Sequence, residues 1–224
     1  MSKTHATKMM IALGLCSGLS IASAATLRGE VVATGGNGSG STPCVVCHGV
    51  TGQGQPAAGF PRLAGMNAVY LSKQLKGFKE GARSNAVMGP IAKTLDDADA
   101  DALGLYYASM KAVDDPARAP ADPSMVVAGK VIALKGDWNR GLPGCAQCHG
   151  AQGFGVGTSF PQLAGQSAPY LANQLDSWRS GTRTNDAMHL MQGVAVKLGS
   201  KDVQSVANYY SSLSAVPPTQ RKKP

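Results

Sequence analysis

Aromatic residues make up only 5% of the 224 residues of this chain, whereas glycine is abundant, with 28 residues. A chain of this length can form one or two domains. It has too few aromatic side chains to fill two aromatic-rich cores. The composition makes sense if each domain packs around a large apolar cofactor. No segment alternates apolar and polar residues clearly enough to predict a strand, so the pattern favours a helical protein.

The sequence also lacks a concentrated run of one charge. Its formal net charge is +8, but the basic residues are dispersed, which argues against nucleic-acid binding. Their one cluster is Arg221-Lys222-Lys223 in the basic tail, residues 217–224. We interpret this tail as a solvated end, with docking to an acidic partner as the alternative. The glycine-rich loops do not match a phosphate-binding pattern, so nucleotide binding is excluded as well.

Residues 1–24 have the parts of a secretory signal peptide. Two lysines precede an apolar run over residues 9–21, and a small-residue cleavage site ends at Ala24. The run is shorter than the roughly 20 apolar residues that span a bilayer, although an uncleaved membrane anchor is the alternative. The sequence therefore predicts an exported protein whose mature chain begins at Ala25.

Removal of this segment takes away Cys16, and the four cysteines that remain all belong to one repeated pattern. The pattern is Cys-x-x-Cys-His, and its two copies are Cys44-Val45-Val46-Cys47-His48 and Cys145-Ala146-Gln147-Cys148-His149. No thiol is left for a disulfide or a nucleophile.

Cys-x-x-Cys-His is typical of covalent haem c attachment. Two thiols three residues apart can each add to a haem vinyl group, which gives two thioether bonds. The adjacent imidazole, of His48 or His149, is then held under the iron as its proximal ligand. The alternatives are a redox-active cysteine pair and a zinc site of four thiolates, but both leave the histidine after each pair unexplained. The sequence therefore predicts two haem c groups.

The rest of the chain repeats with a period of about 100 residues. The matching segments share the patterns Phe-Pro-x-Leu-Ala-Gly, Tyr-Leu-x-x-Gln-Leu, Gly-x-Arg-x-Asn and Tyr-Tyr, beginning at residues 60, 70, 81 and 106 and again at 160, 170, 181 and 209. Two copies are too few for a solenoid, so we expect two homologous domains, residues 25–113 and 124–216. Residues 114–123 contain three prolines, which predicts a semi-rigid linker between them.

Each half contains signals for the same series of helices. Asn67 and Ser167 are suitable N-cap residues for a middle helix, and Ser124 is suitable for the first helix of the second half. Asp96, with Asp99 placed to reach back, predicts the start of a last helix. The expected fold is all-α.

The sixth iron ligand separates catalysis from electron transfer, because an open position allows catalysis whereas a methionine closes it and raises the reduction potential. Met88 is the candidate in the first half. The second half has three extra residues here, so that Met188 keeps the distance from Asn185 and Met191 keeps the distance to Leu198. We favour Met191, because its segment overlays that of Met88 without a gap. Met188 is the alternative, and core filling is the other interpretation of these methionines.

Both halves resemble class I c-type cytochromes, and the tandem resembles the dihaem cytochrome c4 family. The resemblance rests on the repeated motifs, the methionine and the Tyr-Tyr helix, and it covers essentially the whole mature chain. It implies periplasmic electron transfer by two lobes that are related by a pseudo-twofold axis, with haems close enough to exchange electrons. It also implies that the carbonyl groups of Pro61 and Pro161 accept the Nδ1–H of His48 and His149.

The resulting prediction is a monomeric electron carrier that is not an enzyme. Its expected electron donor is a quinol-oxidising complex or a dehydrogenase, and its expected acceptor is a terminal oxidase or reductase. Docking to membrane-bound respiratory complexes is part of this prediction. One alternative is an electron-transfer subunit of a fixed dehydrogenase complex. Another is a dihaem oxidoreductase, such as a peroxidase, but of four histidines only His189 lies outside the signal peptide and the two motifs. We interpret His189 as a solvent-facing loop residue.

Overall fold

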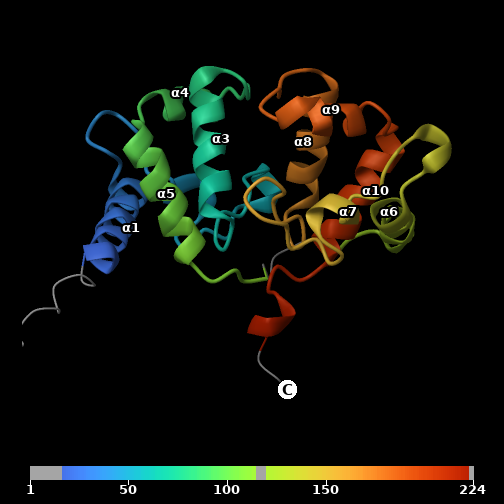
Figure 1. Cartoon of the computed structure of the whole chain (residues 1–224), viewed down its shortest axis with the longest axis horizontal. Coiled ribbons are helices and arrows are strands. Elements are labelled where there is room, and N and C mark those ends of the chain that lie inside the picture. The colour runs from blue at the N-terminus through green and yellow to red at the C-terminus, as the bar shows by residue number, and fades with distance from the viewer. Residues whose placement is uncertain (1–16, 115–119, 222–224) are drawn as a thin grey trace, which may run out of the picture.

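The computed structural model describes residues 17–114 and 120–221, and this part of the chain is helical (Figure 1). Isolated β-bridges are the only extended pairings within those ranges. The prediction of an all-α protein is therefore confirmed. The predicted signal peptide falls largely on residues 1–16, and part of the linker and the end of the tail fall on residues 115–119 and 222–224, which lie outside the described residues.

The two halves contain the same succession of helices. Those of the first half are α1 (Ser17–Gly35), α2 (Val45–His48), the 3-10 turn η1 (Pro56–Ala58), α3 (Ala68–Glu80), α4 (Met88–Lys93) and α5 (Asp97–Ser109). Those of the second half are α6 (Pro123–Lys135), η2 (Trp138–Arg140), α7 (Ala146–His149), α8 (Ala168–Arg179), η3 (Ala187–His189), α9 (Leu190–Ala195) and α10 (Ser200–Ser212), followed by η4 (Pro218–Gln220). Among the described residues, no helix is long and apolar enough to cross a membrane.

Most helix starts follow from capping chemistry, with one correction. Ser167 is the N-cap residue of α8 as predicted, but its hydroxyl makes no capping hydrogen bond. The side chain of Asn67 accepts the N–H of Tyr70 at 3.0 Å, and Asp96 and Asp99 form a capping box at the start of α5, as predicted. Ser124 was predicted to cap α6, and this is wrong. Asp122 is the N-cap, because its carboxylate accepts the N–H of Ser124 and the intervening proline suits the first helical position.

Each half has its own core, in which the first and last helices cross at a glycine. A Cβ on Gly29 of α1 would collide with the backbone of Ala102 in α5, and a Cβ on Gly129 of α6 would collide with the backbone of Ser205 in α10. Glycine at these positions therefore allows the two helices of each half to approach closely. The same arrangement in both halves supports the interpretation of a duplicated domain.

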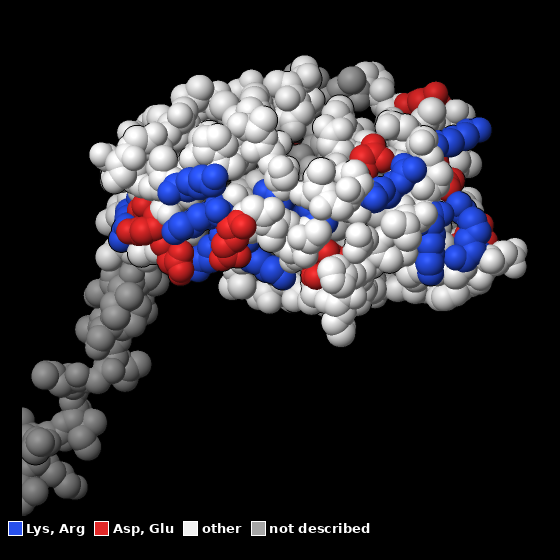
Figure 2. All heavy atoms as spheres, turned by 90° about the horizontal axis from the view of Figure 1, so that it is seen from above, with Lys and Arg blue, Asp and Glu red and all other residues white. Residues whose placement is uncertain are grey.

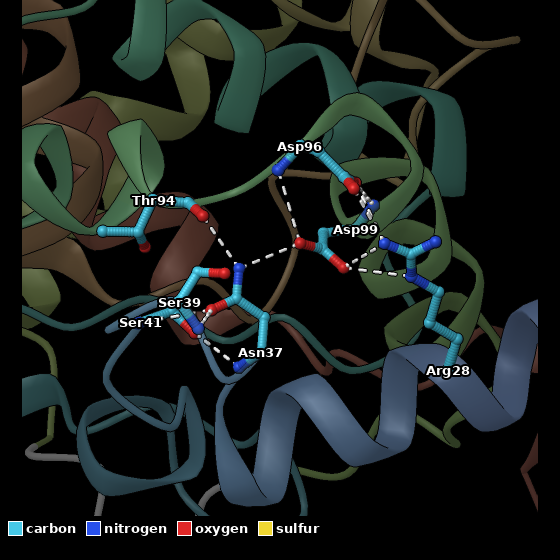
Figure 3. A network of polar contacts seen from close by, with 7 residues as sticks. All are labelled: Arg28, Asn37, Ser39, Ser41, Thr94, Asp96 and Asp99. Carbon is cyan, nitrogen blue, oxygen red and sulfur yellow. Dashed lines mark hydrogen bonds and ion pairs between the residues drawn. The ribbon is translucent and has the colours of Figure 1, made fainter.

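A polar network fastens α1 and the following loop to α5 in the first half (Figure 3). The guanidinium of Arg28 donates to Asp99 at 2.7 Å and to Asp96 at 2.9 Å. The amide of Asn37 donates to the other oxygen of Asp99 at 3.0 Å and to the carbonyl of Thr94 at 2.8 Å. These contacts fix the Gly-Ser-rich loop that precedes the first Cys-x-x-Cys-His motif.

The halves face each other across α3 and α8 at the centre of Figure 1. The segments that follow these helices form an antiparallel bridge between Arg83 and Arg183. In it, the N–H of Ser84 donates to the carbonyl of Thr182 at 2.7 Å, and the N–H of Thr184 donates to the carbonyl of Ala82 at 2.7 Å. Because the same pair of positions is used from both sides, the halves are related by an approximate twofold axis at this point.

Charged side chains of both signs are interspersed on the face shown in Figure 2. This distribution agrees with the dispersed basic residues of the sequence rather than with one basic patch.

Candidate haem attachment sites

Each Cys-x-x-Cys-His motif forms a single helical turn. Cys44 is the N-cap of α2 and His48 is the last residue of that helix, and the N–H of His48 donates to the carbonyl of Cys44 at 2.9 Å. Cys145 and His149 stand in the same relation at α7. Residues three and four positions apart lie on one side of a helix, so each turn presents two thiols and an imidazole together.

The two imidazoles are held in one tautomer by backbone carbonyl groups. His48 Nδ1 lies 2.9 Å from the carbonyl oxygen of Pro61, and His149 Nδ1 lies 2.8 Å from that of Pro161. A carbonyl can only accept, so Nδ1 carries the proton and Nε2 keeps its lone pair for a metal. The predicted roles of both prolines are confirmed.

Burial favours the neutral form of these imidazoles. The side chains of His48 and His149 belong to residues that are only 5% and 6% exposed. Burial lowers the pKa of each imidazole, and the hydrogen bond to the proline carbonyl opposes this shift only in part. A neutral imidazole with a free Nε2 is the form that binds iron.

The structure also bears on the two alternative roles of the cysteines, a redox-active pair and a zinc site of four thiolates. Burial raises the pKa of the Cys44 and Cys145 thiols to about 11 in each case, whereas the reactive thiol of a redox pair has a lowered pKa. Within the described residues, which include all four cysteines of the motifs, no three His, Cys, Asp or Glu side chains come together as a metal site. The four cysteines therefore do not converge on one site in the described part of the chain, and the raised pKa of Cys44 and Cys145 differs from that of a redox pair.

Two arginines near the interface between the halves are buried with neutral hydrogen-bond acceptors. Arg83 and Arg183 are 6% and 3% exposed, and the hydrogen-bond acceptors of their guanidinium groups are neutral amide and hydroxyl oxygens. The indole N–H of Trp178 is buried and has no hydrogen-bond partner among the described residues. Each attachment turn supplies two thiols and an imidazole with a free Nε2, so the residues present fit haem c.

The candidate methionine ligands of the two halves occupy equivalent positions. Met88 is the first residue of α4 and Met191 is the second residue of α9, and both are half-buried. In each half the candidate's N–H is capped by a side chain, since Met88 donates to Asn85 Oδ1 at 2.8 Å and Met191 donates to Asp186 Oδ2 at 2.9 Å. Ligation of iron by these two residues stays a prediction.

The alternative ligand Met188 points away from the protein. It is 85% exposed, and both Met188 and His189 have left-handed backbone conformations with φ of 55°. The three extra residues of the second half are therefore turned outward at η3, and Met191 keeps the register of Met88. His189 is exposed, as predicted.

A buried polar cluster at the interface could not be foreseen from the sequence, although its members belong to the repeated motifs. Arg83 Nη2 donates to Tyr170 Oη at 2.8 Å and to Gln174 Oε1 at 2.6 Å. Reciprocally, Arg183 Nη2 donates to Gln74 Oε1 at 2.7 Å. Spacing within each half predicted these residues, but it does not tell which of them face the other half.

The aromatic rings of α3 and α8 support the same two arginines. The guanidinium carbon of Arg83 lies 4.2 Å from the ring centre of Phe78, and that of Arg183 lies 3.9 Å from the ring centre of Trp178. A cation over an aromatic face is stabilised most when both are desolvated, as they are here.

Known proteins resemble the chain over nearly all of the described region. The family model described as cytochrome c matches residues 35–111 and 126–214. A protein of Stutzerimonas stutzeri (strain A1501) called thiosulfate dehydrogenase electron acceptor is 45% identical over 184 residues, which is 82% of this chain and 85% of that protein.

Two solved structures share the arrangement of both halves. Reduced recombinant cytochrome c4 from Pseudomonas stutzeri gives a TM-score of 0.71 at 34% identity, covering 86% of this chain and 98% of that one. The thiosulfate dehydrogenase TsdBA from Marichromatium purpuratum gives a TM-score of 0.76 at 35% identity and covers 89% of this chain. The present chain spans 42% of the TsdBA chain.

Proposed function

Because this chain belongs to the cytochrome c family, as a dihaem c4-like electron carrier rather than a catalytic enzyme, we propose that it accepts electrons from a thiosulfate dehydrogenase. Its two haem c groups are covalently attached, as predicted. Two iron centres let the carrier take up two electrons, one at each site.

The similarity to a named electron acceptor carries this proposal. The 45% identity extends over 85% of the Stutzerimonas protein, so it includes both halves rather than one shared domain. The likeness to TsdBA points to the same donor. Both observations favour the alternative of an electron-transfer subunit of a dehydrogenase complex over a carrier that a quinol-oxidising complex reduces. Onward transfer to a terminal oxidase or reductase is the second part of the proposal.

We propose the following ligands for the two haems. The first would be attached through Cys44 and Cys47, and His48 and Met88 would hold its iron. The second would be attached through Cys145 and Cys148, and His149 and Met191 would hold its iron.

When bound, each haem supplies an iron that alternates between the ferric and ferrous states. The protein residues prepare the site for this exchange. The carbonyl groups of Pro61 and Pro161 fix the imidazoles, and a methionine thioether at the iron would close it to a substrate. The buried histidines and half-buried methionines limit the access of water to each site.

The proposed mature protein is a periplasmic monomer. Its domains are residues 25–113 and 124–216, joined by the linker 114–123, with residues 1–24 as the signal peptide and 217–224 as the tail. Cleavage after Ala24 would retain the part of α1 that contacts α5, because Arg28 and Gly29 make those contacts. The proposed organisation therefore preserves the core of the first half.

The donor is tested by mixing the purified, oxidised protein with a thiosulfate dehydrogenase at catalytic concentration. We expect the haem absorption to report complete reduction when thiosulfate is added, and none when either thiosulfate or the dehydrogenase is omitted. Failure of reduction by the dehydrogenase, together with rapid reduction by a quinol-oxidising complex, would overturn the proposed donor. Size-exclusion chromatography of the same mixture distinguishes a stable subunit from a diffusible carrier.

A further inference from the structure

One asymmetry interrupts the twofold relation at the interface, and it involves the asparagines of the Gly-x-Arg-x-Asn motifs. In the first half, Asn85 caps its own helix, because its Oδ1 accepts the N–H groups of Val87 and Met88 at 2.9 and 2.8 Å. In the second half, Asn185 reaches into the other half, where its Nδ2 donates to Gln74 Oε1 at 3.0 Å.

The three extra residues before Met191 explain this difference. They move the start of α9 away from Asn185, and Asp186 takes over the capping role. Its Oδ2 accepts the N–H groups of Met191 and Gln192 at 2.9 and 3.1 Å. Asn185 is therefore free of its helix, and its Oδ1 accepts from Arg183 Nε at 3.1 Å instead.

The first half has room for this asparagine and the second half has no matching space. A Cβ on Gly77 of α3 would lie 2.8 Å from Asn185 Nδ2, so only glycine leaves the contact undisturbed. The equivalent residue of α8 is Ser177, whose hydroxyl donates to the carbonyl of Asn173 at 2.7 Å. The sequence thus encodes a notch in α3 and none in α8.

Gln74 is the acceptor at the base of this notch. Its Oε1 accepts from Asn185, from Arg183 at 2.7 Å and from Arg83 at 3.3 Å. Oε1 of Gln174, the equivalent residue, accepts from the two arginines alone at 2.6 and 2.8 Å. Gln74 is 7% exposed, and a hydrogen bond in such surroundings is stronger than one in water.

We propose that Gln74 and Gly77 of the first half are positioning residues for the sixth-ligand loop of the second half. They hold Asn185, and Asn185 anchors the segment that leads to Met191. The proposal rests on ligation of the second haem by Met191. The Met191–iron bond then depends on an asparagine held by the other half, whereas the equivalent Asn85 bonds only within its own half.

The full-length holoprotein offers matched variants for the test. Gln74→Ala and Asn185→Ala each remove the tether, and Gly77→Ala displaces it. Gln174→Ala removes both arginine bonds at the equivalent position but leaves Asn185 in place, and Ser177→Ala is the control for Gly77→Ala.

The measurement is NMR of the shifted methyl resonance of each iron-bound methionine, assigned with Met88→Ala and Met191→Ala. We expect Gln74→Ala, Asn185→Ala and Gly77→Ala to shift the second resonance and to raise the population lacking that ligand about tenfold. The first resonance should not change, and the two control variants should leave the second one unshifted. The effect of the double variant Gln74→Ala/Asn185→Ala should be smaller than the sum of the two single effects, because both variants remove the same bond between Asn185 and Gln74.

Equal effects of Gln74→Ala and Gln174→Ala on the second site would overturn the proposal, as would an unchanged second site in Asn185→Ala. Exchange of the Met191 amide hydrogen provides an independent measure of the tether. If Met191→Ala leaves the second haem's spectrum intact, the proposed ligand fails. Faster amide exchange in Gln74→Ala would then still report the tether.

Discussion

At the scale of single residues, the two sites depend on a few hydrogen bonds that come from outside the Cys-x-x-Cys-His motif. The carbonyl groups of Pro61 and Pro161 choose the histidine tautomer, and one capping side chain sets the start of each methionine-bearing helix. The motif supplies the ligands, and these neighbouring groups orient them.

Met191→Ala is expected to abolish the methionine–iron charge-transfer absorption of one haem, because it removes a half-buried thioether from the start of α9. Met188→Ala is expected to leave both haems unchanged, since Met188 is 85% exposed. The ferric absorption spectrum measures both results. The opposite pattern would make Met188 the ligand.

Asp99→Asn is expected to destabilise the first half at neutral pH. Burial by itself would raise the pKa of Asp99, but hydrogen bonds from Asn37 and Arg28 bring it below its usual value. Such a carboxylate stabilises the fold above its unfolded-state pKa of about 3.9, and this stabilisation is lost as the pH falls through the lower folded value. We expect a loss of about 2 kcal/mol at pH 7.

Urea denaturation of Asp99→Asn at a series of pH values checks this expectation. The difference from the unmodified protein should shrink as the solution is acidified below about pH 4. The control is Asp97→Asn, because the Asp97 side chain is 74% exposed. A difference that stays constant with pH would contradict the role given to the Asp99 charge.

At the scale of helices, close crossings depend on glycine. Gly29→Ala and Gly129→Ala should each destabilise the protein by about 3 kcal/mol, since the added methyl group meets backbone atoms of the facing helix rather than a side chain that can move. Gly35→Ala in the same helix as Gly29 should have little effect, because no atom lies within 4 Å of the added Cβ. Thermal unfolding measures all three variants.

Much of this helical organisation could be predicted, because its signals are local. The capping residues Asn67 and Asp96 correctly predicted the starts of α3 and α5. Ser124 was the wrong choice for α6, because Asp122 is also a suitable N-cap residue. The proline between them occupies the first helical position, which makes Asp122 the N-cap. The outward turn at Met188 could not be predicted either. Sequence spacing shows that the second half has three extra residues, but it does not show which residues loop out of the fold.

At the scale of the whole molecule, the two halves share one buried polar interface. Its partners lie up to 113 residues apart in the chain, so local patterns carried no information about it. Arg62 adds a further link, because Gln166 bonds its backbone N–H and carbonyl groups, at 3.0 Å each.

We expect the holoprotein to unfold in one calorimetric transition, because the interface couples the two cores. The double variant Arg83→Ala/Arg183→Ala should separate this into two transitions, since it removes the donors that each half contributes to the other. Differential scanning calorimetry measures the number of transitions. Two transitions in the unmodified protein would show that the halves are independent.

The Gly77 notch has a consequence for what a duplicated protein can encode. Two identical subunits in a homodimer must use identical residues, so any glycine introduced to receive a neighbour appears on both sides. Two domains in one chain are free of this restriction. The linker between them also keeps the second half at a high effective concentration near the first. The pair formed by Gly77 and Ser177 shows this freedom in use. One half has specialised as the support for the other, which a single gene product pairing with itself is unable to do.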